Sequence, residues 1–247
     1  MDVAQLAEKL VLWIREQVAA AKRKGVVVGM SGGIDSSVLA VLCHRAFPQS
    51  MVGVIMPCFS KEEDKAHALL VTKKFSIPTT EVILDDILNC LRKALPRYEV
   101  ETTTDLVAQA NLKSRLRMVT LYYVANQLQY LVVGSSNRSE LEVGYFTKYG
   151  DGGVDIMPLG NLVKGQVREL AKFLGIPKPI LDKPPSAGLW AGQTSEEELG
   201  FKYEEVDRYL LGSELAADVK RKIEAKIAAN KHKRSLPPVL DFDNFTP

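Results

Sequence analysis

The sequence predicts an α/β fold, a doubly wound parallel sheet flanked by helices, and two observations carry the prediction. Short apolar runs rich in β-branched residues, at 26–28, 51–56, 79–84 and 130–133, alternate with longer stretches of helical periodicity. Buried parallel strands have this pattern because helices cover both faces of their sheet. A glycine turn also follows the first run directly, and ligands of such sheets bind beyond the carboxyl ends of the strands.

The composition is that of an ordinary globular protein. The 247 residues are 46% apolar and 25% charged, with a net charge of +2. We therefore expect one domain over residues 1–247, with neither a nucleic-acid nor a membrane-binding surface. No apolar run approaches the roughly 18 residues of a spanning helix, and no signal peptide is recognisable at the start. A cytoplasmic location follows from these features.

Neither cysteine nor histidine forms a metal-binding pattern in this sequence. The three cysteines lack metal-ligand spacing, and we expect buried structural thiols in a reducing cytosol: Cys43, Cys58 and Cys90. The three histidines are too scattered to indicate a metal site: His44, His67 and His232.

The first elements follow one another closely. Residues 2–24 form an amphipathic helix that Gly25 ends. Its apolar face is expected to cover the sheet, with a dimer contact as the alternative. The strand at 26–28 leads through the glycine turn into a helix that runs to about Phe47.

The second strand, at 51–56, ends at a proline. Residues beyond a strand end should line the ligand site, and here these are Cys58, Phe59 and Ser60. The next helix spans 61–75, and we expect Ser60 and Glu63 to form its capping box.

A third strand at 79–84 and a short helix at 86–95 precede a long helix over 102–129. Arg115 and Arg117 lie two residues apart in that helix, so they point to different sides and need not share a partner. A solvated basic face is the alternative interpretation.

The second half of the chain is less regular. After the fourth strand, the segment 134–155 has weak periodicity, and we interpret it as a binding loop because long loops in compact domains are usually functional. A helix over 164–174 ends at Gly175. The remaining segments are a proline-rich irregular stretch at 176–190, a polar and mobile one at 193–200, helices at 203–211 and 214–230, and a basic tail at 231–238.

The glycine turn carries the chemistry. Residues 31–36 read Ser-Gly-Gly-Ile-Asp-Ser between a buried strand and a helix. A helix N-terminus behind such a turn binds anions, most often phosphate. No Gly-Lys-Ser/Thr follows, so this is not a Walker loop, and Asp35 stands where that loop has its lysine. A carboxylate beside phosphates is explained if it holds Mg²⁺. The alternative is an ordinary glycine turn capped by serine.

The turn resembles the SGGxDS loop of ATP pyrophosphatases, and further motifs narrow the resemblance. Six further motifs occur in the order and spacing of NAD synthetase: 111–118, 134–140, 144–152, 183–187, 199–203 and 232–234. The stretch Phe-Thr-Lys-Tyr-Gly-Asp-Gly-Gly at 146–153 is the most specific. The resemblance implies a Rossmann-like fold of the adenine nucleotide alpha hydrolase type. It also implies a ligase that converts deamido-NAD, ammonia and ATP into NAD, AMP and pyrophosphate, through an adenylated carboxyl.

The resemblance also implies roles for individual residues. ATP would contact Gly29, Met30, Ser31, Gly32, Gly33, Ile34, Asp35, Ser36, Ser135, Lys164 and Ser186. Deamido-NAD would contact Arg115, Lys148, Asp155, His232 and Lys233. Asp35 and Glu140 would hold Mg²⁺. Lys148 and Lys164 would stabilise charge on the adenylated intermediate, and Asp155 would orient either the pyridine ring or the ammonia.

The sequence departs from many family members in places. Ser135 and Ser186 replace threonines and keep the hydroxyl, and the Ser-Asn-Arg-Ser at 136–139 together with 186–190 is similar to archaeal-type members. The family implies a homodimer, and without a glutaminase domain the nitrogen donor is free ammonia or a separate glutaminase. Two rivals remain: another ATP pyrophosphatase, such as a tRNA-modifying or GMP-synthetase-like enzyme, and a nucleotide-binding protein without turnover.

Overall fold

The computed structural model describes residues 2–186, 188–190 and 193–240. Four parallel strands form its sheet in the order β3-β2-β1-β4: β1 (Val26–Gly29), β2 (Met51–Ile55), β3 (Thr79–Glu81) and β4 (Leu131–Val133). Val26 is in register with Met51 on one side and Leu131 on the other. The predicted parallel α/β fold is confirmed. Ala187, part of the motif at 183–187, lies outside the described residues.

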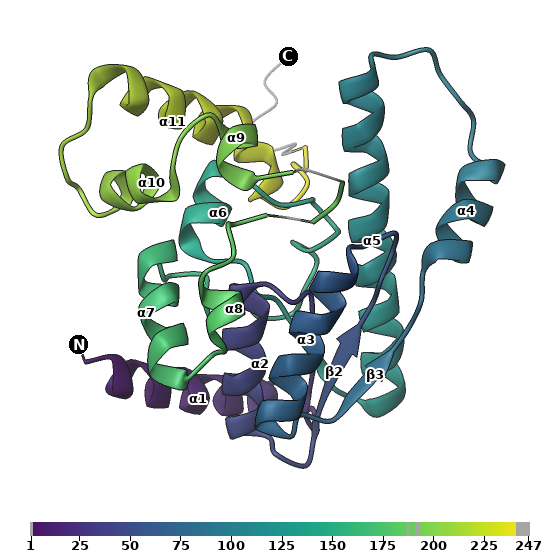
Figure 1. Cartoon of the computed structure of the whole chain (residues 1–247), viewed down its shortest axis with the longest axis vertical. Helices are drawn as coiled ribbons and strands as arrows, with labels where there is room; N and C mark the ends of the chain where they lie inside the picture. Colours follow the sequence, from purple (N-terminus) through teal and green to yellow (C-terminus); the bar gives the residue numbers. More distant parts are fainter. Residues whose placement is uncertain (1, 187, 191–192, 241–247) are drawn as a thin grey trace.

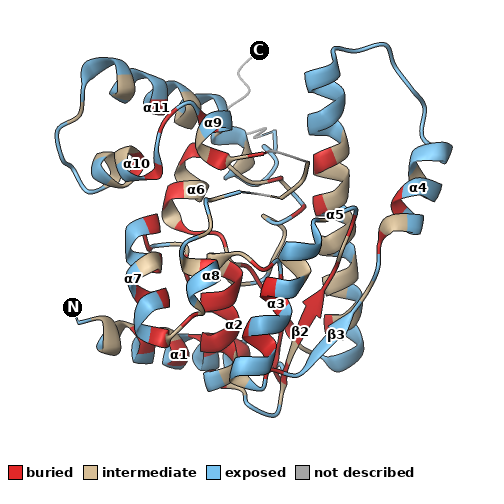
Figure 2. Cartoon of the chain, in the orientation of Figure 1, coloured by how far each residue is buried: buried red, intermediate tan, exposed pale blue. Residues whose placement is uncertain are grey.

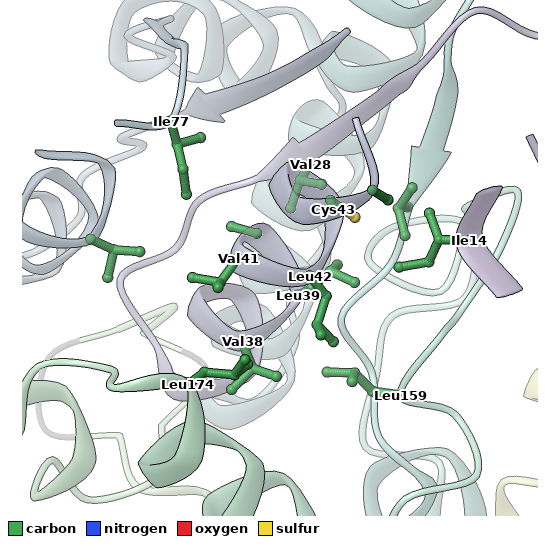
Figure 3. Packing of buried hydrophobic residues seen from close by; sticks show 14 of the residues in the cluster. Ile14, Val28, Val38, Leu39, Val41, Leu42, Cys43, Ile77, Leu159 and Leu174 are labelled. Atoms are coloured by element: carbon green, nitrogen blue, oxygen red, sulfur yellow. The ribbon is translucent and has the colours of Figure 1, made fainter. Parts of the chain in front are cut away.

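One face of the sheet is covered by four helices: α1 (Val3–Ala20), α2 (Ile34–Ala46), α3 (Glu62–Phe75) and α7 (Lys164–Leu174). Val28 of β1 points into this core together with Leu39 and Leu42 of α2 (Figure 3), and Val26 belongs to the same core. Figure 2 shows α2 as the most buried helix of the layer. Because α2 starts at the phosphate loop, its burial fixes the position of that loop.

Two helices cover the opposite face: α4 (Asp85–Ala94) and α5 (Thr102–Leu128). Leu88 of α4 and Ala125 of α5 pack against Val27, Val54 and Val132. Val27 therefore faces the second core while its neighbours face the first, as expected for a strand covered on both sides.

A third cluster lies above α7 and α2 in Figure 1. It consists of α6 (Arg138–Val143), α9 (Ser195–Leu199), α10 (Tyr203–Leu210) and α11 (Ala217–Ala229), joined by buried side chains that include Val143, Phe201, Val206 and Ile223. Two short elements complete the described chain: α8 (Lys178–Leu181) and the 3₁₀ turn η1 (Lys231–Lys233).

Two predicted boundaries in the first half are wrong. The first helix ends at Ala20 rather than at Gly25, because Lys22 already takes a left-handed backbone with φ 53°. Gly25 instead packs against the chain before β2, where a Cβ would lie 1.9 Å from the carbonyl oxygen of Ser50. The third strand ends at Glu81, three residues before its predicted end.

The predicted capping box of α3 is also wrong. Its N-cap residue is Lys61, without a side-chain hydrogen bond. The Ser60 hydroxyl accepts instead from the backbone N–H of Cys58 (3.2 Å) and from Arg117 Nη2 (3.1 Å). With its oxygen engaged there, Ser60 cannot cap the helix.

Further corrections concern the second half and one thiol. The predicted loop 134–155 contains α6, and the proline-rich stretch contains α8. The polar stretch at 193–200 contains α9, and its mobility stays a prediction. Cys43 and Cys58 are buried as expected, but Cys90 is exposed. Among the described residues, no helix is both long and apolar enough to cross a membrane.

Candidate active site

The phosphate loop connects β1 to α2 and is held by its serines. The hydroxyls of Ser31 and Ser36 lie 2.9 Å apart, and both Ser36 and Ser37 donate to the carbonyl of Gly33, at 3.1 Å and 2.7 Å. Gly32 has a φ of +78°, and a Cβ there would lie 2.1 Å from the carbonyl oxygen of Asp64 in α3. Only glycine fits this position, and the loop presents the unpaired first N–H groups of α2 to an anion.

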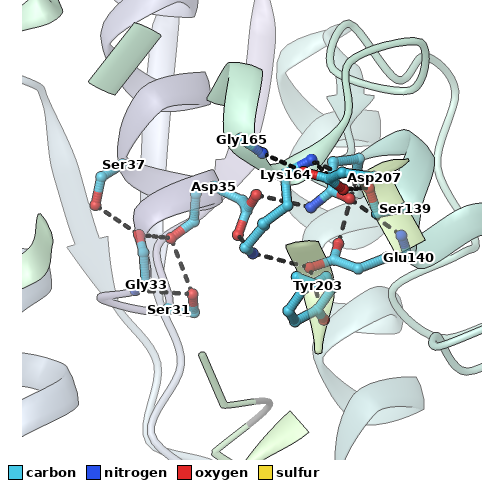
Figure 4. A network of polar contacts seen from close by, with 12 residues as sticks. Ser31, Gly33, Asp35, Ser37, Ser139, Glu140, Lys164, Gly165, Tyr203 and Asp207 are labelled. Atoms are coloured by element: carbon cyan, nitrogen blue, oxygen red, sulfur yellow. Dashed lines mark hydrogen bonds and ion pairs between the residues drawn. The ribbon is translucent and has the colours of Figure 1, made fainter. Parts of the chain in front are cut away.

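A buried lysine joins two carboxylates beside this loop (Figure 4). Lys164 Nζ lies 2.5 Å from Asp35 Oδ2 and 3.1 Å from Glu140 Oε1. Asn137 Nδ2 donates to the other oxygen of Asp35 at 2.9 Å, and Asn137 also caps α6 through the backbone N–H of Glu140. The three charged side chains come from the starts of α2, α6 and α7.

The charge balance of this cluster is negative when Glu140 is ionised. Lys164 is 3% exposed, and the side chain of Glu140 is 16% exposed. Burial raises the pKa of Glu140 to about 7, although Lys164 partly opposes this. Burial alone would lower the pKa of Lys164, but the carboxylates of Asp35 and Glu140 raise it above its usual value. Two carboxylates and one ammonium leave room for additional positive charge.

The donor set fits a magnesium ion. Mg²⁺ in nucleotide enzymes is held by one or two carboxylates, while waters and substrate phosphates complete its shell. Asp35 and Glu140 supply such oxygens next to the phosphate loop. In the described part of the chain, no group of three or more His, Cys, Asp or Glu side chains is placed to hold a metal ion.

A cavity of about 310 Å³ opens beside the cluster. Most residues predicted to bind ATP line it: Gly29, Met30, Ser31, Gly33, Ile34, Asp35, Ser135, Lys164 and Ser186, together with Glu140. Gly32 and Ser36 are not part of its lining. The end of β2 and α5 add Ser60 and Arg117, whereas Cys58 is buried and Phe59 faces solvent, contrary to the prediction that both line the site.

The residues predicted to bind the dinucleotide lie outside this cavity and mostly form one group. Arg115 Nη2 donates to the carbonyl of Lys148 (3.2 Å), and Lys148 Nζ donates to the carbonyl of His232 (2.7 Å). Lys233 Nζ donates to the carbonyls of Gly144 (2.9 Å) and Phe146 (3.1 Å). These bonds fasten the C-terminal segment to the 144–152 loop.

Asp155 is separate from that group. Its carboxylate accepts from the backbone N–H of Val132 (2.8 Å) and from the hydroxyl of Tyr122 (3.0 Å). In this structure Asp155 fastens the chain after the loop to β4 and α5.

Sequence reasoning missed several residues of the site. The Asn-x-x-Glu pattern at 137–140 is a capping-box signature that could have been recognised. The sequence shows Arg117 only as part of a basic motif, whereas its side chain reaches from α5 to the end of β2 and donates to the carbonyl of Met56 (3.1 Å) and to the hydroxyl of Ser60. Asp207, which contacts the start of α7, carries no local signal.

Comparisons with known proteins agree with this geometry. A family model described as NAD synthase matches residues 6–237. The chain is 47% identical over 236 residues to an NH3-dependent NAD+ synthetase of Carboxydothermus hydrogenoformans, covering 94% of this chain and 95% of the relative. It is 44% identical over 257 residues to one of Methanocaldococcus jannaschii, covering 98% of each.

Solved structures share the fold of this chain. The NMN synthetase from Francisella tularensis matches with a TM-score of 0.91 at 36% identity, over 98% of this chain and 100% of that one. An NH3-dependent NAD synthetase from Campylobacter jejuni, in complex with nitrate, matches with a TM-score of 0.81 at 27% identity, over 98% and 100%. The resemblance inferred from the sequence is confirmed, and the chain belongs to the NAD synthase family.

Proposed function

We propose that the protein converts deamido-NAD, ATP and ammonia into NAD, AMP and pyrophosphate. The observation that carries this proposal is the Lys164 ammonium between Asp35 and Glu140, next to a phosphate loop at the edge of the sheet. The relative from Carboxydothermus hydrogenoformans, named an NH3-dependent NAD+ synthetase, is 47% identical to this chain over 236 residues.

The reaction has two steps. A nicotinate carboxylate is a poor electrophile, so its oxygen first attacks the α-phosphorus of ATP and pyrophosphate leaves. The nitrogen of ammonia then attacks the activated carboxyl carbon, AMP leaves with the former carboxylate oxygen, and the nitrogen loses a proton. Positioning and charge neutralisation supply most of the rate in phosphoryl transfer. The N–H groups of the loop and the Lys164 ammonium provide both.

Asp35 and Glu140 would hold the magnesium ion of Mg-ATP. The bound ion supplies positive charge to the phosphate oxygens. Lys164 lies between the two carboxylates, so it keeps them close together and limits their mutual repulsion. Lys148, Arg115, His232 and Lys233 would contact deamido-NAD.

For Asp155, the hydrogen bonds to Val132 and Tyr122 support a role in fixing the loop that carries Lys148. That role replaces direct contact with the pyridine ring or ammonia in our proposal. Loss of its carboxylate should therefore affect substrate affinity through the loop.

A second candidate substrate is the mononucleotide. The Francisella tularensis NMN synthetase matches this chain with a higher TM-score than the Campylobacter jejuni NAD synthetase, 0.91 against 0.81. Amidation of nicotinate mononucleotide uses the same chemistry on a smaller acid, so the ATP-binding half of the site would serve both.

The test is pyrophosphate release from Mg-ATP with each acid at equal concentration, with and without ammonium. Release that requires deamido-NAD, with NAD formed once ammonium is present, supports the proposal. A higher kcat/KM for nicotinate mononucleotide would identify an NMN synthetase. If the protein binds Mg-ATP but releases no pyrophosphate with either acid, both candidate activities are contradicted.

We also propose a cytoplasmic homodimer. The three cysteines are unpaired, as is usual in a reducing compartment. Exposed apolar side chains occur along α4 and α5, at the side of the molecule away from α1 and α7: Ile87, Leu106, Val107, Val119, Tyr123 and Leu128. A second copy of the chain related by twofold symmetry would cover them if it packed against this side.

A further inference from the structure

Asp207, on the outer helix α10, makes three hydrogen bonds to the elements that carry the ion cluster. Its Oδ1 accepts from the hydroxyl of Ser139 (2.5 Å) and from the backbone N–H of Lys164 (3.2 Å). Its Oδ2 accepts from the backbone N–H of Gly165 (2.7 Å). Figure 4 shows the carboxylate between the starts of α6 and α7.

The start of α7 depends on this external carboxylate. Its N-cap residue is Val163, which has no polar side chain with which to satisfy the first N–H groups. Asp207 takes the place that serine, threonine or aspartate usually holds at this position, and it adds negative charge at the positive end of the helix. Gly165 allows the close approach, because a Cβ there would lie 3.2 Å from Asp207 Oδ2.

The same carboxylate also contacts Ser139, the residue before Glu140. Ser139 precedes Glu140 in α6, is fully buried, and accepts from the Lys164 N–H (3.1 Å) while it donates to Asp207. One turn before Asp207, the ring of Tyr203 lies with its centroid 5.0 Å from Lys164 Nζ. One face of α10 therefore contacts the backbone and the side chain of Lys164.

We infer that Asp207 is a positioning residue for the reaction, which sets Lys164 and Glu140 at their mutual distance. This inference rests on the proposed function. Asp207 does not line the cavity, so its effect passes through the two residues it holds. Displacements of about 1 Å in a catalytic group can cost up to roughly 100-fold in rate.

The test compares four single variants: Asp207→Ala, Asp207→Asn, Ser139→Ala and Glu204→Gln. Glu204 is an exposed acid of the same helix and serves as the matched control. Two measurements are made on each protein with the full chain. Amide hydrogen exchange reports the order of the start of α7 without any substrate, and steady-state kinetics give kcat and the KM for deamido-NAD.

Asp207→Ala is expected to speed amide exchange at the start of α7. It should also lower kcat by about 10- to 100-fold, with the KM for deamido-NAD within about twofold. Asp207→Asn keeps one good acceptor and should recover part of kcat. Ser139→Ala should also lower kcat while leaving the KM for deamido-NAD nearly unchanged, but its loss of kcat should be smaller than that of Asp207→Ala. Glu204→Gln should match the original protein in both measurements.

Unchanged exchange and kcat in folded Asp207→Ala would overturn the inference. Equal losses in Asp207→Asn and Asp207→Ala, both traced to a lower melting temperature, would also overturn it. If Asp207→Ala does not fold, Asp207→Asn and Ser139→Ala decide by the same criteria. Absence of turnover in the original protein would contradict the proposed function instead, and hydrogen exchange would still test the positioning.

Discussion

Asp35 has two neighbours that hold its two oxygens separately, Lys164 on Oδ2 and Asn137 on Oδ1. We expect Asp35→Asn to lower kcat by about 10²- to 10³-fold, as when a charge-stabilising group is removed from an active site. The melting temperature should fall by only a few degrees, because the burial of α2 does not depend on this side chain.

Kinetics and thermal melting check this expectation. Asp218→Asn is a suitable control, since Asp218 also lies in the first turn of a helix, α11, but is exposed. Comparable losses of activity in both variants would point to a general helix-charge effect. Near-normal activity of Asp35→Asn would contradict the role of this carboxylate in the metal site.

Glu140 should make the stability of the protein depend on pH. Its pKa is raised from 4.5 to about 7, mainly by burial, so the folded state holds the proton more tightly than the unfolded state. Its contribution to the free energy of unfolding is therefore complete below about pH 4.5 and is lost as pH rises through about 7. The loss should be on the order of 1–3 kcal/mol.

Replacing Glu140 by glutamine removes this titration. Urea unfolding without ATP and magnesium, at intervals from pH 5 to pH 8, should give a flatter pH dependence for Glu140→Gln than for the original protein. The exposed Glu204→Gln should keep the original slope. If the Glu140→Gln and original curves run parallel, the carboxyl is not raised as described.

At the scale of elements, the phosphate loop approaches the backbone of α3 closely at Gly32. Gly32 and Gly200 share a φ of +78°, but only at Gly32 would a Cβ meet another backbone, the carbonyl of Asp64. Around Gly200 no described atom lies within 4 Å of such a Cβ. Gly32→Ala and Gly200→Ala therefore add the same conformational strain, of about 1 kcal/mol. They differ because only the new Cβ of Gly32→Ala collides with the carbonyl of Asp64.

We expect Gly200→Ala to lower the melting temperature slightly and to keep the KM for ATP. Gly32→Ala must displace α3 or the loop, so it should raise the KM for ATP at least about tenfold, since loop geometry governs phosphate binding. Titration with ATP and thermal melting measure both effects. Equal behaviour of the two variants would mean that the loop tolerates the displacement.

Elements with their own periodicity could be predicted from the sequence. The buried strands and α2 are continuous apolar runs, α5 and α7 repeat apolar residues at helical steps, and the Ser-Gly-Gly-Ile-Asp-Ser turn is a local pattern. Contacts between distant residues could not be predicted in this way. Asn137 reaches Asp35 across 102 positions and Asp207 reaches Gly165 across 42, and nothing in the neighbouring residues specifies either partner.

The capping box predicted for α3 failed for a related reason. Ser60 and Glu63 satisfy the local pattern, but Arg117, 57 positions away, binds the serine hydroxyl. A tertiary contact thus competed with a local one and shifted the helix start to Glu62. Short helices such as α6 and α9 have too few turns to show periodicity, so only a cap could reveal them, as the Asn-x-x-Glu pattern at 137–140 does for α6.

At the scale of the whole molecule, three clusters of buried side chains meet around the site. The first core carries the phosphate loop and Lys164, the second carries Arg117, and the third, through α6 and α10, carries Glu140 and Asp207. Since the charged residues come from different layers, the ion cluster forms only when the layers pack together. The site is consequently sensitive to the packing of helices that contact no substrate.

The outer face of α5 offers the test of assembly. Val119 and Tyr123 lie one turn apart and are 59% and 64% exposed. If a second copy of the chain covers this face, Val119→Glu buries a charge in the interface, and light scattering at micromolar concentration should show a shift from dimer to monomer.

Phe173→Glu is the matched control, because Phe173 is 50% exposed on α7, at the opposite side of the sheet. It should leave the mass unchanged. A monomeric original protein would contradict the dimer outright, whereas a dimer that survives Val119→Glu but dissociates in Phe173→Glu would place the interface on α7.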